Sequence, residues 1–396
     1  MDFFQKCYDY RDADMAREMG IYPYFVPIEE SSGTEVVIKG KKVLMVCSNN
    51  YLGLTHDPRV KEAAINAIKR FGTSGCGSRL ANGNFILHNE LDERLARFIG
   101  KPAALVYPAG FLANAGSISC LIDSNDMVFS DEDNHSSIIA GCRLGRGRVI
   151  RYAHNDSNDL AAKVKENSAK GGALIVADGV FSMAGTIVDL PGLVKVKRDN
   201  PPMRLYIDEA HGIGVLGKDG RGTTNHFGLT DEVDLIMGTF SKTFASVGGF
   251  VAGPKEVINF MQHRSSGEIF SAAATPASVA AILKVLDIIE TEPEHVERLR
   301  KNMRKMREAF ESLNINFIPS DTAILCIRVG DEFKTCRLVM ELLERGLFTT
   351  PVVYPVVPQG QGLIRTAYMA THTEEQLNFA LDLIREFAPK YGLFRQ

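Results

Sequence analysis

The chain has 396 residues, enough for a large hydrophobic core and two or three domains. Hydrophobic residues make up 45% and charged residues 23%, as in ordinary globular enzymes, and the net charge of −3 gives no reason to expect nucleic acid or an anionic membrane as a partner. The seven cysteines include no CxxC pair, which argues against a disulfide framework or a metal site and predicts a protein of the reducing cytoplasm. No apolar run approaches the roughly 18 residues of a membrane-spanning helix, and the charged N-terminal segment lacks the apolar core of a signal peptide.

The first part of the chain is predicted to form a helix, an extended arm and a hairpin. Residues 1–20 are polar and predict an amphipathic helix. The aromatic, proline-rich segment 21–28 cannot be helical and is expected to be an extended arm. Strands are predicted at 35–38 and 43–47, and a helix with an aspartate N-cap and proline in its first turn is predicted over 57–70.

Short apolar runs alternate with helical patterns between residues 103 and 252. This rhythm predicts an α/β fold with a large, mostly parallel seven-stranded sheet and helices on both faces. The expected strands cover residues 104–107, 127–130, 149–152, 173–177, 205–208, 235–238 and 250–252. Ligands in such folds bind at the C-terminal ends of the strands.

The pattern changes after Pro276, where mixed helices and strands predict a smaller α+β domain. Helices are expected at 276–289, from a capping box at 291–294, at 334–345 and after Thr373, and strands at 323–329 and 363–369. The predicted domains are an N-terminal arm and hairpin (1–55), a large domain (56–285) and a C-terminal domain (286–396).

Three polar residues follow two of the predicted strands. Asp208 ends one strand, His211 comes three residues later, and Lys242 stands just beyond a second strand, between apolar segments. A lysine held where water is scarce loses its proton easily, as a Schiff-base lysine must. A carboxylate that keeps a ring nitrogen protonated, a nearby imidazole and such a lysine are the groups that pyridoxal phosphate requires. Lys242 alone would read as an ordinary surface residue, but together with Asp208 and His211 it favours this cofactor.

Other residues fit the same cofactor, although each also has an ordinary structural explanation. His135 follows a strand, where its ring could stack on a planar cofactor or be a solvated loop histidine. The amides of Gly110 and Phe111 open a predicted helix and could bind a phosphate. Ser182 could reach the ring oxygen or cap a helix. Arg365 lies in an apolar strand and could bind a substrate carboxylate or form a structural salt bridge.

Taken together and in order, the motifs resemble those of one known family. By resemblance the chain is identified as a member of the α-oxoamine synthases, pyridoxal-phosphate enzymes of fold type I, the aspartate aminotransferase-like fold. The resemblance extends from Tyr22 to the final helix. The segments that carry it are SNNYLG (48–53), GF (110–111), NHSSI (134–138), DGVFSM (178–183), DEAHG (208–212), GTFSK (238–242), FSA (270–272) and IR (364–365).

The resemblance implies a role for each candidate residue. Lys242 would carry the cofactor, Asp208 would pair with its ring nitrogen, and His211 with Ser182 would contact its ring oxygen. The catalytic residues would be Lys242, His135, Asp208 and His211. His135 would stack on the ring face. The phosphate would be held by Thr239, Gly110, Phe111 and a partner subunit's copy of Ser271. Arg365 with Asn50 would bind the substrate carboxylate.

The arm at 20–28 and the segments 231–242 and 369–373 are most similar to the bacterial members that condense L-serine with palmitoyl-CoA. That reaction gives 3-oxosphinganine, CoA and CO₂, the first step of sphingolipid synthesis. The implied protein is a cytoplasmic, homodimeric acyltransferase with shared active sites, no transmembrane segment and possible contact with a membrane surface. SNNYLG and YPVVPQGQ (354–361) are closer to glycine-using members, so glycine C-acetyltransferase remains an alternative. A second alternative within the family is 8-amino-7-oxononanoate synthase.

Two features bear on the substrates and on the remaining classes of function. The arm at 20–28 lacks the arginines with which members using carboxylate-tailed acyl groups bind them, so we expect a long, uncharged acyl chain. Ala184 stands where relatives usually carry an acidic residue. An aminotransferase or lyase, and a non-catalytic subunit, are further alternatives, and Lys242 argues against the second.

Overall fold

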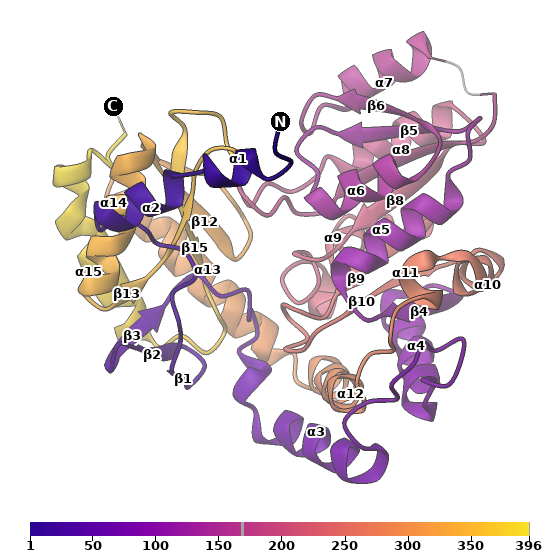
Figure 1. Cartoon of the computed structure of the whole chain (residues 1–396), viewed down its shortest axis with the longest axis horizontal. Helices are drawn as coiled ribbons and strands as arrows, with labels where there is room; N and C mark the ends of the chain where they lie inside the picture. Colours follow the sequence, from indigo (N-terminus) through magenta and orange to yellow (C-terminus); the bar gives the residue numbers. More distant parts are fainter. Residues whose placement is uncertain (168–169, 396) are drawn as a thin grey trace. The chain divides into compact units, whose positions relative to one another are not determined.

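The computed structural model describes residues 1–167 and 170–395 (Figure 1). The chain divides into two compact units. The larger unit comprises Asn49–Ser182 and Thr186–Arg300, and the smaller unit comprises Met1–Ser48, Met183–Gly185 and Lys301–Gln396. The division into three consecutive domains with boundaries at 55 and 285 stays a prediction.

A seven-stranded sheet forms the centre of the larger unit. Every strand predicted for it is present, within one residue at each end. The strands are β4 (Ala103–Tyr107), β5 (Met127–Asp131), β6 (Arg148–Tyr152), β7 (Ala173–Asp178), β8 (Arg204–Asp208), β9 (Leu235–Thr239) and β10 (Gly249–Gly253). Their order is β4-β10-β9-β8-β7-β5-β6, and only β10 is antiparallel to its neighbours. The predicted large, mostly parallel sheet is confirmed.

The register of the parallel strands brings several polar residues to one edge of the sheet. Asp178 at the end of β7 is paired with Asp208 at the end of β8, and Asp208 is paired with Met237 of β9. Asp131 ends β5, and Thr239 ends β9. This C-terminal edge is where ligands bind in α/β folds.

Helices cover the sheet because its strands are apolar on both faces. Figure 1 shows α5 and α6 in front of the sheet, and their residues Ala113, Ile118 and Ile138 pack with Val176 and Tyr206 of the strands. The helices of this unit are α3 (Pro58–Phe71), α4 (Ile86–Ile99), α5 (Gly110–Leu121), α6 (Ser136–Leu144), α7 (Ser157–Glu166), α8 (Leu190–Asp199), α9 (Thr223–His226), α10 (Lys255–Arg264), α11 (Ser266–Ile269) and α12 (Pro276–Thr291), with 3₁₀ turns at Leu54–His56, Lys218–Gly220 and Thr230–Glu232.

The smaller unit contains two four-stranded sheets. The first joins β1 (Glu30–Ser31), β2 (Glu35–Ile38), β3 (Lys41–Met45) and β13 (Leu347–Phe348), so the N-terminal hairpin pairs with a C-terminal strand. The second, wholly antiparallel sheet joins β11 (Phe317–Ile318), β12 (Ile324–Gly330), β15 (Gly362–Ala367) and β14 (Thr350–Val352). The helices are α1 (Gln5–Tyr8), α2 (Asp12–Glu18), α14 (Glu332–Glu344) and α15 (Glu374–Tyr391), and α13 (Glu294–Ser312) contains the boundary between the units. The predicted smaller α+β domain is confirmed, as is the capping box of Thr373 and Gln376 on α15.

Two local predictions are wrong. The helix predicted over 1–20 is two short helices, because neither α1 nor α2 buries a residue and short helices without a packed face are marginal in water. The capping box predicted at 291–294 is absent: Thr291 is the last residue of α12, and its hydroxyl donates to the carbonyl of Asp287. The apolar pattern of α12 continues through Ile289, which holds this turn in the helix.

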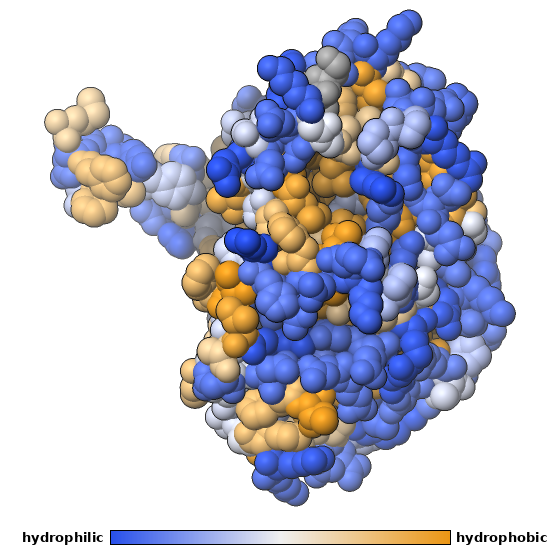
Figure 2. Space-filling model, turned by 90° about the vertical axis from the view of Figure 1, so that its right-hand side faces the viewer, coloured by the Kyte–Doolittle hydropathy of each residue, from blue (hydrophilic) through white to orange (hydrophobic). Residues whose placement is uncertain are grey.

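Figure 2 shows the side of the molecule that lies on the right in Figure 1, where orange apolar surface gathers in patches among blue polar residues.

A cavity of about 510 Å³ lies at the N-terminal ends of β5, β7, β8 and β9, lined by Met127, Ala173, Arg204 and Leu235 among others. It is therefore at the end of the strands opposite to Asp208 and Lys242. Within the described ranges, none of the helices combines the length and apolarity that crossing a bilayer requires.

Candidate active site

A pocket of about 180 Å³ lies at the C-terminal edge of the large sheet. It collects residues from β7, β8, β9, α5, α6 and the turns that follow the strands. The lining residues are Gly110, Phe111, Asn114, His135, Ser137, Asp178, Asp208, Ala210, His211, Met237, Thr239, Ser241 and Lys242. Seven of the residues predicted from the sequence to form the site are among them: Gly110, Phe111, His135, Asp208, His211, Thr239 and Lys242.

Asp208 is fixed in the floor of this pocket. It is 2% exposed, and each carboxylate oxygen accepts a hydrogen bond: Oδ1 from the amide of Ala210 at 2.8 Å and Oδ2 from Nδ2 of Asn114 at 2.7 Å. Asn114 is itself held, since its Oδ1 accepts from the hydroxyl of Tyr206 at 2.8 Å and its Nδ2 also donates to Ser137 Oγ at 2.9 Å. A buried carboxylate that accepts in this way is oriented as a hydrogen-bond acceptor for a cationic N–H group in the pocket.

Lys242 belongs to the turn between β9 and β10. The turn rests on two fully buried aromatic rings, Phe240 and Phe244, whose centroids lie 5.4 Å apart. It is closed by hydrogen bonds from the amide of Phe240 to Gly248 O at 2.9 Å and from the amide of Ala245 to Lys242 O at 3.0 Å. Thr243 Oγ1 also donates to Ile213 O at 2.7 Å. The backbone that carries Lys242 is thus anchored on both sides of the lysine.

The N-terminus of α5 and the end of β9 make a small cradle. Gly110 is the first residue of α5, and a Cβ atom added there would lie 2.5 Å from Thr239 Oγ1. Thr239 Oγ1 donates to Gly248 O at 3.0 Å and also contacts Ser241 Oγ at 3.0 Å. Unpaired amides at a helix N-terminus together with hydroxyl groups are a binding site for a phosphate. The cradle fits the phosphate of the predicted cofactor, because only a glycine at position 110 leaves room for it beside Thr239.

We expect Gly110→Ala to weaken the affinity for pyridoxal phosphate by roughly 10- to 100-fold, the loss of one or two hydrogen bonds to a charged group. The physical reason is the added Cβ, which would occupy the cradle beside Thr239. Titration of the cofactor into the purified protein measures the affinity. Gly172→Ala is the matched control, because a Cβ there meets its neighbour Asp126 at an ordinary 3.5 Å. Equal affinities of the two variants would contradict the assignment of the cradle.

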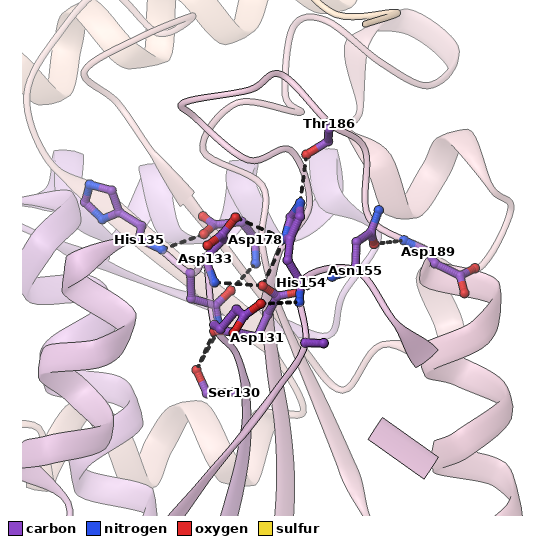
Figure 3. A network of polar contacts seen from close by, with 12 residues as sticks. Ser130, Asp131, Asp133, His135, His154, Asn155, Asp178, Thr186 and Asp189 are labelled. Atoms are coloured by element: carbon purple, nitrogen blue, oxygen red, sulfur yellow. Dashed lines mark hydrogen bonds and ion pairs between the residues drawn. The ribbon is translucent and has the colours of Figure 1, made fainter. Parts of the chain in front are cut away.

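His135 caps α6 beside the pocket. Its amide donates to Asp178 Oδ2 at 2.7 Å (Figure 3). Its Nδ1 lies 2.7 Å from Ser137 Oγ. Burial lowers the pKa of His135. The charge of Asp208 raises this pKa, and the charge of Lys242 lowers it. The net pKa is below the ordinary value, so the imidazole is neutral at neutral pH. Burial, and then the charge of Asp208, raise the pKa of Asp178 well above its ordinary value, which favours its protonated form.

His211 stands beside a tyrosine that is distant in sequence. The hydroxyl of Tyr51 lies 2.6 Å from His211 Nδ1, and both side chains are buried. A hydrogen bond at Nδ1 fixes the orientation of the ring and the role of the other nitrogen, Nε2. Tyr51 follows two asparagines of the SNNYLG segment, so this segment reaches the site through its tyrosine.

We expect Tyr51→Phe to lower kcat by roughly tenfold, because it removes one hydrogen bond that orients the imidazole of His211, a predicted catalytic residue. Steady-state rates with the protein saturated in cofactor measure this effect. Tyr152→Phe is a matched control, since Tyr152 is also fully buried but lies at the end of β6, outside the lining of the pocket. A kcat of Tyr51→Phe equal to that of the control would show that the contact does not serve the reaction.

Four predicted site residues do not line the pocket. Asn50 is buried and donates from Nδ2 to Thr55 Oγ1 at 2.8 Å. Ser182 lies in the loop after β7, and Ser271 lies between α11 and α12, next to Phe270, which is 84% exposed. Arg365 is buried in β15 of the smaller unit, where the strand register places it opposite Cys326 of β12 and Thr350 of β14. Their predicted roles stay predictions.

The profile of the family described as "Aminotransferase class I and II" matches residues 41–384. The chain belongs to this family. It is 46% identical to a serine palmitoyltransferase of Sphingobacterium spiritivorum over 94% of this chain and 93% of the relative, and 40% identical to an 8-amino-7-oxononanoate synthase of Symbiobacterium thermophilum over 95% and 96%. A solved structure of serine palmitoyltransferase from S. paucimobilis with a bound pyridoxal phosphate–myriocin aldimine covers 100% of both chains, with a TM-score of 0.96 and 30% identity. The predicted α-oxoamine synthase resemblance and fold are confirmed.

Several pocket residues of this aminotransferase-family chain were not predicted from its sequence. They are Asn114, Ser137, Asp178, Ala210, Met237 and Ser241. Tyr51, which is outside this lining and contacts His211, was not predicted either. One signal for Asn114 exists: it lies four residues after Gly110, on the same face of α5, and is a polar residue inside an apolar helix. Tyr51 has no such signal, because its contact with His211 spans 160 residues.

Proposed function

We propose that this enzyme is a serine C-palmitoyltransferase. It condenses L-serine with palmitoyl-CoA and releases CoA and CO₂, with 3-oxosphinganine as the product. The observation that carries the proposal is the single pocket that joins Lys242, Asp208 and His211 to a phosphate cradle at Gly110, in a chain 42–46% identical to four serine palmitoyltransferases. The geometry supports the cofactor, and the relatives support the substrates.

The cofactor is pyridoxal 5′-phosphate, and when bound it supplies a carbonyl for amino groups and an electron-withdrawing ring that stabilises negative charge on the carbon beside the amino group. Asp208 would accept a hydrogen bond from the ring nitrogen and keep that nitrogen protonated. His211 and Ser182 would contact the ring oxygen, and His135 would cover the ring face. The residues that would hold the phosphate are Thr239, Gly110, Phe111 and, from a partner subunit, Ser271.

Lys242 has two tasks in the proposed reaction. Its amine would hold the cofactor in the resting enzyme and would serve as the base that takes the proton from the substrate Cα. Arg365, with Asn50, would bind the substrate carboxylate, which leaves as CO₂. The buried rings of Phe240 and Phe244 anchor the backbone that carries Lys242, and a fixed backbone helps to orient the amine for proton transfer.

The protein is proposed to act as a cytoplasmic homodimer with shared active sites. Ser271 does not line the pocket of its own chain, and its neighbour Phe270 is 84% exposed, which fits a segment that serves a second subunit. On the acyl side, the arm at 20–28 carries no lysine or arginine, which fits a long, uncharged acyl chain. Exposed aromatic residues near the N-terminus, among them Phe3, Phe4 and Tyr8, fit contact with the membrane surface that supplies such a substrate.

The test is a substrate panel with the purified, cofactor-loaded enzyme. Palmitoyl-CoA is offered with serine, glycine or alanine, and CoA release and product mass are followed. We expect release with serine and the mass of 3-oxosphinganine. Greater activity with succinyl-CoA or pimeloyl-CoA than with palmitoyl-CoA would contradict the uncharged acyl chain, and amino transfer to a keto acid without CoA release would contradict the reaction class.

A second candidate is 8-amino-7-oxononanoate synthase. The 40% identity to the Symbiobacterium thermophilum enzyme of that name, over nearly the whole of both chains, favours it. In the same panel this function predicts CoA release with alanine and pimeloyl-CoA only. A glycine C-acetyltransferase would instead require glycine with a short acyl-CoA, and the SNNYLG and YPVVPQGQ segments are the features that favour it.

A further inference from the structure

A histidine outside the pocket stands between the sheet and the loop that carries Ser182. His154 follows β6 by two residues, and its Nδ1 lies 3.1 Å from Oδ1 of Asp131, the buried last residue of β5. On the other side of the ring, Nε2 lies 3.3 Å from Thr186 Oγ1. Figure 3 shows the ring of His154 between Asp131 and Thr186, with a contact to each. The histidine therefore links a rigid strand end to a residue of the loop.

The loop that it contacts is a tight hairpin. Val180 and Ile187 form an antiparallel bridge, the amide of Phe181 donates to Thr186 O at 2.9 Å, and the amide of Val188 donates to Gly179 O at 3.0 Å. Ser182 is the next residue after Phe181. The buried ring of Phe181 meets the imidazole of His154 edge-on, with centroids 4.4 Å apart. Both strands of the hairpin, one through Phe181 and the other through Thr186, thus touch His154.

The residue after His154 holds the same hairpin. Asn155 Nδ2 donates to Ile187 O at 3.0 Å, and Asn155 Oδ1 accepts from the amide of Asp189 at 2.7 Å. Its own amide donates to Asp131 Oδ2 at 2.7 Å. Asp131 therefore binds both His154 and Asn155, one with each carboxylate oxygen. These two residues in turn bind the returning strand of the hairpin.

We infer that His154 is a positioning residue: anchored by Asp131, it fixes the hairpin Gly179–Val188 so that Ser182 is presented to the ring oxygen of pyridoxal phosphate. The inference rests on the proposed cofactor-binding role of Ser182. His154 does not touch the cofactor pocket, and its contribution passes entirely through the hairpin.

The charge on His154 strengthens this contact. Burial lowers the pKa of His154, but the hydrogen bond and charge of Asp131, together with the charges of Asp133 and Glu132, raise it above the ordinary value. The groups on the hairpin side, Thr186 and Phe181, do not titrate. The folded state thus prefers protonated His154, so its stabilising contribution is complete below the ordinary histidine pKa and is lost as the pH rises through the raised pKa.

The variants separate the contact of His154 with Thr186 of the hairpin from its contact with Asp131. In His154→Asn the shorter side chain can still donate to Asp131 from near the Nδ1 position but cannot reach Thr186. Thr186→Val replaces the hydroxyl with a methyl group, whereas Thr186→Ser keeps the hydroxyl. His263→Asn is the control, since His263 is an exposed histidine on α10 whose Nδ1 bonds to Asn259 O in its own helix.

Two measurements on the full chain test the inference. Amide hydrogen exchange of Phe181 and Val188, corrected for the intrinsic effect of pH, should show about tenfold less protection in His154→Asn and in Thr186→Val. The Kd for pyridoxal phosphate should rise by roughly 3- to 10-fold in the same variants, the effect of one hydrogen bond. Thr186→Ser and His263→Asn should resemble the wild type. In the wild type, but not in His154→Asn, protection of the hairpin should fall as the pH rises through the raised pKa of His154.

A double variant decides whether the effect passes through Ser182. Ser182→Ala should raise the same Kd, and adding His154→Asn to it should raise the Kd no further, because both changes remove one contact. Unchanged protection in His154→Asn, or effects of His154→Asn and Ser182→Ala that multiply, would overturn the inference. Neither measurement contains serine or acyl-CoA, so an error in the proposed substrates leaves both results readable.

Discussion

Lys242→Ala should lower kcat by at least about 10³-fold, because the variant loses both the amine that attaches the cofactor and the base that takes the substrate proton. The fold should survive, since the turn is held by the buried rings of Phe240 and Phe244 and by Thr243, none of which is changed. Treatment with borohydride should fix the cofactor covalently to the wild type and not to the variant, as mass spectrometry can show.

Lys195→Ala is the matched control for this change. Lys195 is an exposed lysine whose contact is a surface ion pair with Asp199, so its loss should affect neither the rate nor the covalent attachment. Covalent attachment that persists in Lys242→Ala would mean that another lysine carries the cofactor and that the site is wrongly assigned.

The second large effect is expected from Asp208→Asn, which should lower kcat by roughly 10²- to 10⁴-fold. Asparagine keeps the shape of the side chain and can still accept one hydrogen bond, from Ala210 or from Asn114, but it has no charge with which to keep a ring nitrogen protonated. A neutral ring nitrogen is a much poorer acceptor of electrons. Steady-state rates and the visible absorption of the bound cofactor measure the change.

Asp234→Asn is the control for Asp208→Asn. Asp234 is a half-buried aspartate next to the N-terminal end of β9, paired with Lys197 and Arg204 at 2.8 Å each, at the opposite end of the strands from the pocket. Its loss should reduce stability and leave kcat nearly unchanged. If Asp208→Asn also changed stability alone, the carboxylate would have a structural role and the account of the site would fail.

The sheet and the residues on its edge could be predicted because their signals are local. Each of the seven strands is a short apolar run, and a polar residue at the end of such a run must lie at the sheet edge, as Asp208 and Thr239 do. The contacts that support these residues have no local signal. Asn114 bonds to Asp208 across 94 residues, and Tyr51 bonds to His211 across 160. Only the folded chain brings these pairs together.

The wrong predictions have a similar cause. The sequence at 1–20 has the composition of a helix, but none of the residues of α1 or α2 is buried, so the helix is interrupted after Tyr8. The spacing at 291–294 matches a capping box, but Thr291 is kept in α12 by the buried residues just before it. In both places packing decided against the local pattern.

The central claim is that Lys242 and Asp208 serve a decarboxylating condensation of serine with an acyl-CoA. The most direct test supplies L-serine labelled at its carboxyl carbon and follows labelled CO₂ together with CoA. The account predicts one labelled CO₂ for each CoA, only when palmitoyl-CoA is present, and neither product from Lys242→Ala. CoA release without labelled CO₂, or labelled CO₂ without palmitoyl-CoA, would contradict it.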